Sequence, residues 1–262
     1  MVALKEITDY IEELFPTEYA EDFDNIGLIV GRFDKKISKV IICLDCNKNI
    51  VDEAISEGAE LIITHHPVIF NPVKRLTDAD DFGEMIVKAL ENGISIYSAH
   101  TNLDSAPGGL TDTVADKMGL IPFSNMEGVL GRICKAPDGT TAKTLCDKIK
   151  KEFNIPKLYS TITSDKEIKT VALVNGGGGG SLVQTAKELG ADVYISGDLK
   201  HHEHLELKIS DSIDFIEMRH FDSEISVCTL LYEKLNDKLG KDLDVKISTL
   251  QEAALIDTDE IM

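Results

Sequence analysis

A chain of 262 residues has enough material for one large domain or two smaller ones, each with its own buried core. Its 46 acidic and 27 basic residues give a formal net charge of −19, which repels phosphate backbones and argues against free nucleic acid as a partner. No stretch reaches the roughly 18 apolar residues of a membrane helix, and the acidic first residues lack a signal-peptide core, so we expect a cytoplasmic protein without membrane association.

Five cysteines fit the reducing compartment that this location implies. Cys43 and Cys46 form a CxxC pair, but they lie in an apolar run, with no second pair to complete a zinc site. We therefore expect them to be packing residues.

The first half of the sequence alternates apolar strands with amphipathic helices. Helical spacing of apolar residues predicts an opening helix over residues 3–14, which ends before Pro16. The expected order then continues with strand 26–31, strand 39–45, helix 49–58, strand 61–64, helix 82–93, strand 94–100 and helix 110–119. This alternation is typical of a mostly parallel sheet covered by helices.

The second half repeats the alternation around a glycine run at residues 176–180. We expect helix 141–154, strand 169–175, helix 181–190, strand 192–196, a further helical stretch, strand 214–218, helix 223–240 and strand 245–249.

Two fragments, residues 58–64 and 190–196, are alike: each ends a helix with Gly-Ala and an acidic residue and then enters a strand. The likeness favours an α/β fold of two related lobes, with mixed, mostly parallel sheets flanked by helices; chance similarity is the alternative. We expect the first lobe to span residues 1–127, completed by segment 219–262, and the second to span 128–218. In that alignment the His65-His66 pair corresponds to Gly197-Asp198.

Candidate metal ligands follow three of the predicted strands. Strand 61–64 leads into His65 and His66, strand 94–100 into His100 and Asp104, and strand 214–218 into His220 and Glu224. Open parallel sheets place their ligand sites beyond the carboxyl ends of the strands. Imidazoles and carboxylates without a thiolate suit zinc, manganese, iron or nickel, which the sequence does not distinguish.

Adjacent histidines that leave a strand point in different directions, so two ions, one for each imidazole, suit His65 and His66 better than one. Either Glu224 or Asp104 could bridge such a pair, which would lower the pKa of a shared water and bind the attacking and leaving oxygens of a substrate. His220 and Glu224 are four residues apart and share a face if a helix begins near residue 220. The alternative is that each pair is only a surface or turn feature.

Six segments resemble the NIF-three-like family, whose members are often labelled GTP cyclohydrolase I type 2 homologues. They are DNIGLIVG (24–31), THHPVIFNPVKRLT (64–77), AHTNLDSAPGGLTD (99–112), the glycine run, SGDLKHHE (196–203) and RHFDSE (219–224). The resemblance implies a two-lobed protein that forms a homohexameric ring, with two divalent metal ions in each subunit. It implies metal ligation by His65, His66, Asp104, His220 and Glu224, with Glu224 contacting both ions. Two departures are Phe23, where tryptophan is usual, and Arg219 in place of glycine.

Two further features have a functional and a structural reading. The glycine run follows a strand and could cradle a phosphate, but the dinucleotide fingerprint fails at Ser181, so a tight turn is the alternative. His201, His202 and His204 form a second cluster that could line a pocket or lie on the surface. Asp45 and His100 also sit at strand ends, and either could orient a ligand or relay a proton.

These features support three hypotheses. The first is a metal-dependent hydrolase acting on a nucleotide, a phosphoester or a cyclic amide, with His100 as the catalytic proton carrier. The second is a metal-binding scaffold, chaperone or regulatory adaptor without turnover. The third, a dinucleotide oxidoreductase, depends on the glycine run alone.

Overall fold

The computed structural model describes residues 1–126, 130–210 and 213–254, and it divides into two compact units. The first unit comprises Met1–Ala106 and Val227–Met262, and the second comprises Pro107–Ser226. No helix in the described ranges has the length and apolar character needed to cross a bilayer.

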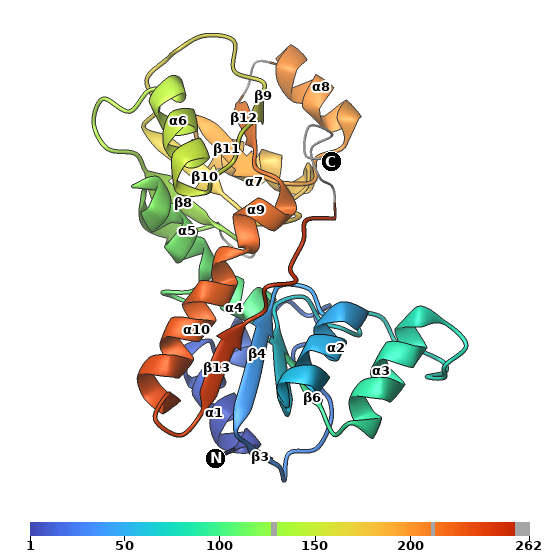
Figure 1. Ribbon diagram of the computed structural model, residues 1–262. Coiled ribbons are helices and arrows are strands. Elements are labelled where there is room, and N and C mark those ends of the chain that lie inside the picture. Colours follow the sequence, from blue (N-terminus) through green and yellow to red (C-terminus); the bar gives the residue numbers. More distant parts are fainter. Residues whose placement is uncertain (127–129, 211–212, 255–262) are drawn as a thin grey trace. The chain divides into compact units, whose positions relative to one another are not determined.

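The first unit is built on a five-stranded sheet with the order β13-β4-β5-β6-β2, in which only β2 runs antiparallel to its neighbour. Its strands and helices, shown in Figure 1, are β1 (Val2–Ala3), α1 (Leu4–Leu14), η1 (Thr17–Tyr19), β2 (Gly27–Val30), β3 (Lys36–Ile37), β4 (Lys39–Cys43), α2 (Lys48–Glu57), β5 (Leu61–Thr64), α3 (Asp81–Glu91), β6 (Ser95–Ser98), α4 (Thr101–Ser105), α10 (Ser226–Leu239) and β13 (Asp244–Ile247).

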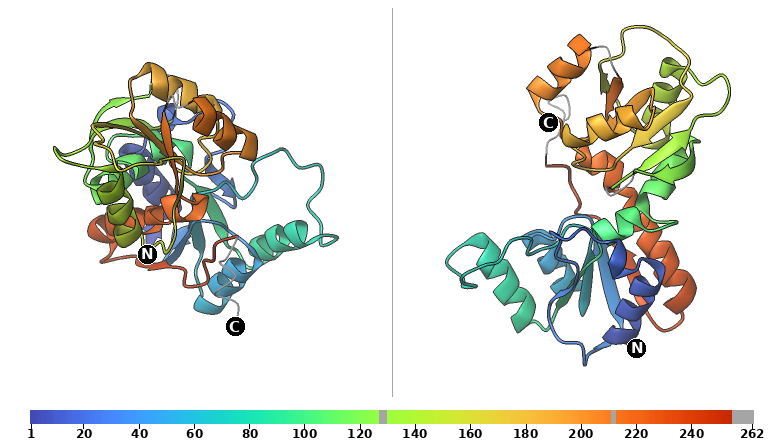
Figure 2. Two further views of the ribbon diagram at one scale, coloured as in Figure 1. Left: turned by 90° about the horizontal axis from the view of Figure 1, so that it is seen from above. Right: turned by 180° about the vertical axis from the view of Figure 1, so that it is seen from behind.

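Helices cover both faces of this sheet because its central strands are apolar on both sides. On one face, Ile41, Ile62 and Ile96 form a core with the buried sides of α2 and α3. Both ribbon views show α1 and α10 on the opposite face (Figure 2). There α1 contributes Leu4 and Ile7, both fully buried. The expectation of a mostly parallel sheet flanked by helices is confirmed for this unit.

The second unit contains a six-stranded sheet with the order β7-β8-β10-β11-β12-β9. Its elements are α5 (Leu110–Met118), β7 (Ile121–Asn125), β8 (Arg132–Lys135), α6 (Ala142–Glu152), β9 (Tyr159–Ser160), β10 (Thr170–Leu173), α7 (Ser181–Glu188), β11 (Val193–Ser196), α8 (His201–Ser210), β12 (Asp214–Glu217) and α9 (His220–Glu224). The central strands β10, β11 and β12 are parallel, while β7, β8 and β9 are antiparallel additions at the edges.

The two units share a central β-α-β-α-β arrangement. In the first, β4, β5 and β6 are adjacent parallel strands; in the second, β10, β11 and β12 are. Gly58 and Gly190 both take a left-handed conformation just before β5 and β11, with φ of 69° and 76°. This shared order agrees with the expected relation between the lobes; the duplication itself stays a prediction.

The division of the chain differs from the expected boundaries at both ends of the second unit. Residues 107–126 belong to the second unit, because α5 packs beside α6 and β7 pairs with β8. The expected boundary at 127 and 128 itself lies outside the described residues. At the other end, residues 219–226 stay with the second unit, and only the chain from Val227 onward completes the first.

Candidate metal centre

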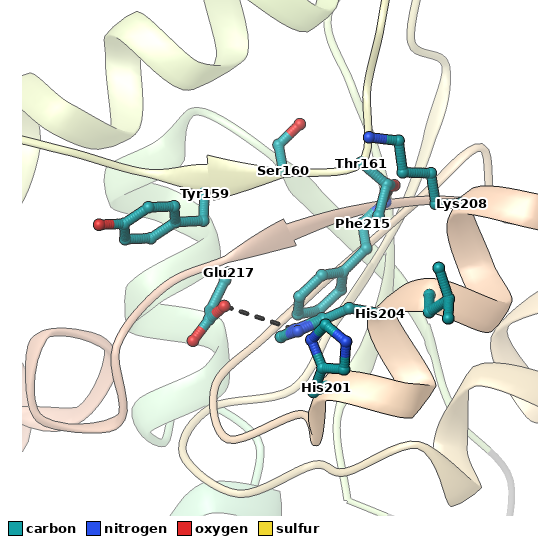
Figure 3. Close-up of a pocket in the computed structure, with 9 residues that line it drawn as sticks. Tyr159, Ser160, Thr161, His201, His204, Lys208, Phe215 and Glu217 are labelled. Carbon is teal, nitrogen blue, oxygen red and sulfur yellow. Dashed lines mark hydrogen bonds and ion pairs between the residues drawn. The ribbon is translucent and has the colours of Figure 1, made fainter.

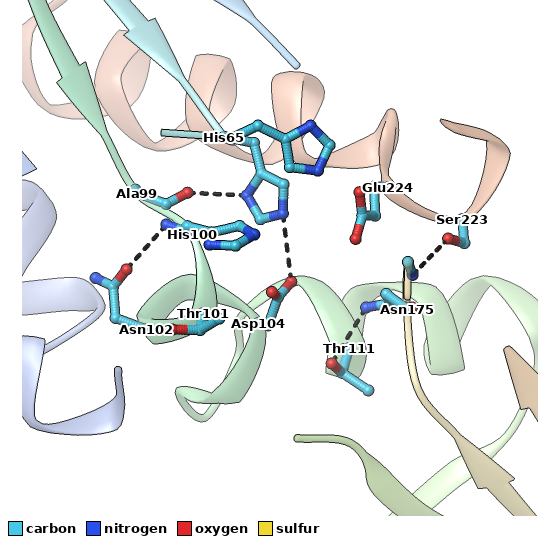
Figure 4. A network of polar contacts seen from close by, with 12 residues as sticks. His65, Ala99, His100, Thr101, Asn102, Asp104, Thr111, Asn175, Ser223 and Glu224 are labelled. Atoms are coloured by element: carbon cyan, nitrogen blue, oxygen red, sulfur yellow. Dashed lines mark hydrogen bonds and ion pairs between the residues drawn. The ribbon is translucent and has the colours of Figure 1, made fainter. Parts of the chain in front are cut away.

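His65 lies immediately beyond β5 and is fully buried. Its Nδ1 donates a hydrogen bond of 2.8 Å to the carbonyl oxygen of Ala99, which follows the neighbouring strand β6 (Figure 4). This contact fixes the ring so that Nε2 lies 3.6 Å from Oδ1 of Asp104 on α4. Asp104 is itself buried, so the short helix α4 holds its carboxylate next to the imidazole.

His66 is oriented by a carboxylate from a different strand end. Its Nδ1 donates to Oδ1 of Asp45, just beyond β4, over 2.7 Å. A histidine whose Nδ1 is held in this way presents Nε2 to a metal, and a carboxylate partner raises the basicity of the ring. Asp45 therefore orients the ring of His66, and metal ligation by His66 stays a prediction.

His100 follows β6 and is held by Asp24. Its Nδ1 lies 2.9 Å from Oδ1 of Asp24, and the backbone N–H of Thr101 donates to the other oxygen of this carboxylate over 3.0 Å. Burial alone would raise the pKa of Asp24, but the hydrogen bonds from His100 and Thr101 outweigh burial and lower the pKa to about 2. Asp24 is therefore ionised at neutral pH, and its carboxylate fixes the orientation of the His100 ring.

The three imidazoles of the first unit gather in one place. The ring centroid of His65 lies 5.1 Å from that of His66 and 5.0 Å from that of His100. The centroids of His66 and His100 are 5.5 Å apart. One nitrogen of each ring lies within 4.8 Å of the others, close enough to surround an ion. Because Nδ1 of His65 and of His66 is already bonded to an oxygen, these two rings can offer Nε2 to a borderline divalent metal, and His100 lies beside them.

An exposed aromatic pair adjoins this cluster. Phe23 and Phe70 pack with their ring centroids 6.3 Å apart, and Phe70 meets His100 edge-on at 6.4 Å. Asn25 ties the two loops together by donating to the carbonyl oxygen of Ile69. The aromatic residue at position 23 therefore forms part of the surface beside His100.

In the second unit, α9 begins at His220 and ends at Glu224, as the spacing of the pair predicted. Nε2 of His220 and Oε2 of Glu224 are 2.9 Å apart, and the Glu224 side chain is buried. The two ligand atoms thus point to the same side of one helical turn. This pair fits a divalent cation by its donor chemistry.

Asp198 orients His220 from the end of β11. Its Oδ2 accepts a hydrogen bond of 2.6 Å from Nδ1 of His220. The backbone of Asp198 adopts φ of 53°, a left-handed conformation that is uncommon for residues other than glycine. Positive φ at a residue with a site contact is typical of functional positions.

The glycine run wraps closely around the same pair. A Cβ atom added to Gly176, whose φ is 58°, would lie 1.9 Å from Oε1 of Glu224 and 3.0 Å from Nε2 of His220. The N–H of Gly176 donates to Oγ of Ser223, and the preceding Asn175 donates to Thr111 of α5 (Figure 4). A Cβ at Gly180 would meet the Glu203 carboxylate at 2.3 Å. These glycines make room for carboxylate side chains, which favours the tight-turn reading over the phosphate cradle.

Several sequence-based expectations have a clear structural outcome. Arg219, which departs from the glycine usual in the family, takes φ of −45°, which any residue can adopt, and its guanidinium donates to Asp222. Cys43 is buried in the core of the first unit, where burial raises its thiol pKa, and Cys46 packs against that core. The packing role expected for both cysteines is confirmed, and all five cysteines are free thiols.

Two orienting groups were not anticipated from the sequence. Asp24 lies 76 positions before His100, and the acceptor for His65 is the backbone carbonyl of Ala99, which no side-chain pattern reveals.

A family model for Duf34/NIF3 (NGG1p interacting factor 3) matches residues 2–254. The chain belongs to this family. A relative from Clostridium acetobutylicum named "GTP cyclohydrolase 1 type 2 homolog" is 34% identical over 250 residues, covering 91% of each chain. Drosophila melanogaster "NIF3-like protein 1" is 29% identical over 249 residues, covering 90% of this chain and 84% of the relative.

Solved structures show the same fold. Reduced HcgD from Methanocaldococcus jannaschii is 30% identical with a TM-score of 0.84, covering 95% of this chain and 98% of the other. A Staphylococcus aureus protein is 28% identical with a TM-score of 0.83, covering 100% and 99%. The family resemblance noted from the sequence is confirmed.

Proposed function

We propose that this chain is a divalent-metal-dependent hydrolase. In this proposal His65, His66 and Asp104 supply metal ligands from the first unit, and His220 and Glu224 supply them from the second. Each chain binds two ions, and the protein acts in the cytoplasm. The names of its relatives, which include "GTP cyclohydrolase 1 type 2 homolog", support a nucleotide as the class of substrate.

One observation carries the proposal: the three proposed histidine ligands are held in the same way. Nδ1 of His65 donates to a backbone carbonyl, and Nδ1 of His66 and of His220 donate to the carboxylates of Asp45 and Asp198. Metal-binding histidines almost always donate the other ring N–H to a carboxylate or a backbone carbonyl in this way.

The protein's own groups have separate tasks in hydrolysis. Bound divalent ions would lower the pKa of a water molecule and would stabilise the negative charge that develops on the reacting oxygens. Asp24 holds Nδ1 of His100, so Nε2 of that ring can accept a proton from water and return it to the leaving group. We therefore assign His100 as the proton carrier, with Phe70 packed edge-on against its ring.

The deciding experiment is elemental analysis of the purified protein combined with a hydrolysis screen of nucleotides, phosphoesters and cyclic amides. We expect about two metal equivalents per chain in the wild type and a marked loss in Glu224→Ala, because that carboxylate faces His220. Glu188→Ala, which removes an exposed glutamate of the same unit, is the control and should keep the metal. Unchanged metal content in Glu224→Ala would contradict the proposal.

A second variant separates catalysis from metal binding. His100→Gln should keep its metal and lose turnover by about two orders of magnitude, the usual contribution of a general acid–base. Loss of metal from this variant would make His100 a ligand instead. Full metal content without turnover of any substrate in the screen would favour the scaffold, chaperone or adaptor alternative and rule out the hydrolase.

A further inference from the structure

A carboxylate orients a histidine only as firmly as it is itself held. In the second unit, His201 and His204 line a pocket of about 380 Å³ beside α8, one of the two placements expected for this cluster (Figure 3). There Nε2 of His204 lies 3.4 Å from Glu217, which is longer than an ordinary hydrogen bond of about 2.7–3.2 Å. In the first unit, Nδ1 of His66 lies 2.7 Å from Asp45, although the Asp45 side chain is 58% exposed and that of Glu217 only 28%. Side-chain packing therefore does not explain the shorter contact, and the backbone that carries Asp45 must be fixed.

Leu44, the residue before Asp45, is held at both of its backbone polar groups. Its carbonyl oxygen accepts the hydroxyl of Thr64 over 2.8 Å and the N–H of His66 over 3.1 Å. Its N–H donates to Oε1 of Gln251, far along the chain. Because the carbonyl of Leu44 belongs to the peptide group that leads into Asp45, these contacts fix the direction in which the chain enters the Asp45 position.

Gln251 takes the place of a hydrogen bond of the sheet. Strand β13 pairs in parallel with β4 as far as Ile247 opposite Ile42, and the N–H of Ser248 donates to the carbonyl oxygen of Ile42 over 2.9 Å. The next bond of a parallel ladder would join the N–H of Leu44 to the carbonyl oxygen of Ser248. Instead, the Gln251 carboxamide lies between these two groups, with Oε1 accepting from Leu44 and Nε2 donating to Ser248 over 3.3 Å. Since a backbone N–H can only donate, this pairing also sets which end of the amide is the oxygen.

Further contacts hold the Gln251 carboxamide in this position. The thiol of the buried Cys228 on α10 donates to the same Oε1 over 3.3 Å. Burial raises the pKa of this thiol to about 12, so it stays protonated and remains a donor at neutral pH. Ser248, which accepts from Nε2, is itself buried, and its hydroxyl donates to Glu53 of α2. Gln251 thus joins β4, α10 and the C-terminal segment within the first unit.

We propose that Gln251 is a positioning residue of the candidate metal centre, which fixes the backbone at Leu44 and thereby the Asp45 carboxylate that orients His66. Without the carboxamide, the N–H of Leu44 loses its acceptor and the bend at residues 44 and 45 loses one of its supports. The ring of His66 is then free to turn, and Nε2 faces the ion for less of the time. This proposal deepens the proposed function and rests on it for metal binding by His66.

The first test is titration of the full-length, metal-free protein with zinc alone. Gln251→Met removes the carboxamide and keeps the length of the side chain. We expect its zinc affinity to fall about tenfold, the lower end of the loss seen when a group that orients a metal ligand is removed. Glu252→Met, at the neighbouring exposed position, is the matched control and should bind zinc as the wild type does.

The second test needs no metal, because proton NMR can detect the imidazole N–H groups directly. The Nδ1 proton of His66 should be observable in the wild type, since its hydrogen bond to Asp45 slows exchange with water, and should be lost in Gln251→Met. The corresponding proton of His65, which donates to a backbone carbonyl, should persist in both and shows that the sheet is intact. Gln251→Asn is one methylene too short to join the two backbone groups and should also lose the His66 signal. It replaces Gln251→Met if that variant does not fold.

A double-mutant cycle separates positioning from a general loss of stability. In Asp45→Ala, where His66 has lost its carboxylate partner, Gln251→Met should change zinc affinity by less than about twofold. A full tenfold loss in that background would overturn the inference, as would wild-type zinc affinity with an intact His66 signal in Gln251→Met. If the wild type binds no zinc, the proposed function fails, and the His66 signal alone then decides the role of Gln251.

Discussion

At Gly176 the backbone itself forms the wall beside the Glu224 carboxylate. The residue combines a left-handed φ of 58° with a position where any Cβ would lie 1.9 Å from Oε1 of Glu224. Gly179, with φ of 61°, shares the conformation, but nothing lies nearer to its Cβ position than an oxygen at 4.0 Å. Alanine at Gly179 should therefore introduce backbone strain alone, whereas alanine at Gly176 should introduce the same strain and also displace the Glu224 carboxylate.

We expect Gly176→Ala and Gly179→Ala each to lose about 1 kcal/mol of unfolding free energy, because alanine is strained at positive φ. Only Gly176→Ala should also lose metal, with an affinity at least tenfold lower, because its methyl group displaces Glu224. Denaturant titration measures the first effect and metal titration the second. Equal metal affinities in the two variants would show that the close approach is unimportant.

The start of β4 shows how one carboxylate fixes a strand in the first unit. Oε2 of Glu60 accepts the backbone N–H groups of Ser38 and Lys39 over 2.9 and 3.0 Å, and Oε1 accepts the Ser38 hydroxyl. Burial opposes ionisation of Glu60, but these hydrogen bonds outweigh it, so its pKa is lowered from 4.5. The lowered pKa links the stability of this unit to pH.

A group whose pKa is lower in the folded state stabilises the protein above its unfolded pKa and loses this effect as the pH falls through the folded value. We therefore expect Glu60→Gln to lose about 1.5 kcal/mol at pH 7, the contribution of a hydrogen bond to a charged group. The difference from wild type should shrink below about pH 4. Denaturation at several pH values measures this, with Glu91→Gln as an exposed control. A difference that does not change with pH would contradict the assignment.

The sequence predicted the central elements well because their patterns are strong. The runs that became β4, β5, β10 and β11 are apolar throughout, and α2 and α7 are each followed closely by a glycine. The edge strands β7 and β9 were missed, because β7 contains Pro122 and is largely exposed, and β9 has only two residues. Such strands depend on pairing with distant residues, which local patterns do not encode.

The sequence predicted where the histidines of the candidate site lie in the fold, but it did not predict the groups that orient His65 and His100. His65, His66, His100 and His220 all lie at strand ends, as expected. His220 and Glu224 belong to the second unit, which the sequence did not predict. The boundary between the units falls at the start of α10, and the sequence there reads as one uninterrupted helix.

For the whole molecule, the family membership leads us to propose a homohexamer. Six copies of the 28.8 kDa chain have a mass of about 170 kDa. The edge strand β7 supports self-association, since Ile121 and Phe123 are 60% and 63% exposed, and exposed apolar edges are usually covered. Light scattering coupled to size-exclusion chromatography should give this mass. A monomeric or dimeric mass at micromolar concentration would contradict the hexamer.

The order in which the sheet of the first unit is assembled has a consequence for synthesis on the ribosome. Its edge strand β13 pairs with β4, joining residue 244 to residue 39, and the whole second unit is made in between. The nascent chain therefore exposes one side of β4 until almost all of the protein has been translated. The inserted unit, by contrast, is continuous from residue 107 to 226 and can fold as soon as it leaves the exit tunnel. A chaperone that binds unfinished sheets would thus find its target in the earliest part of this chain to emerge.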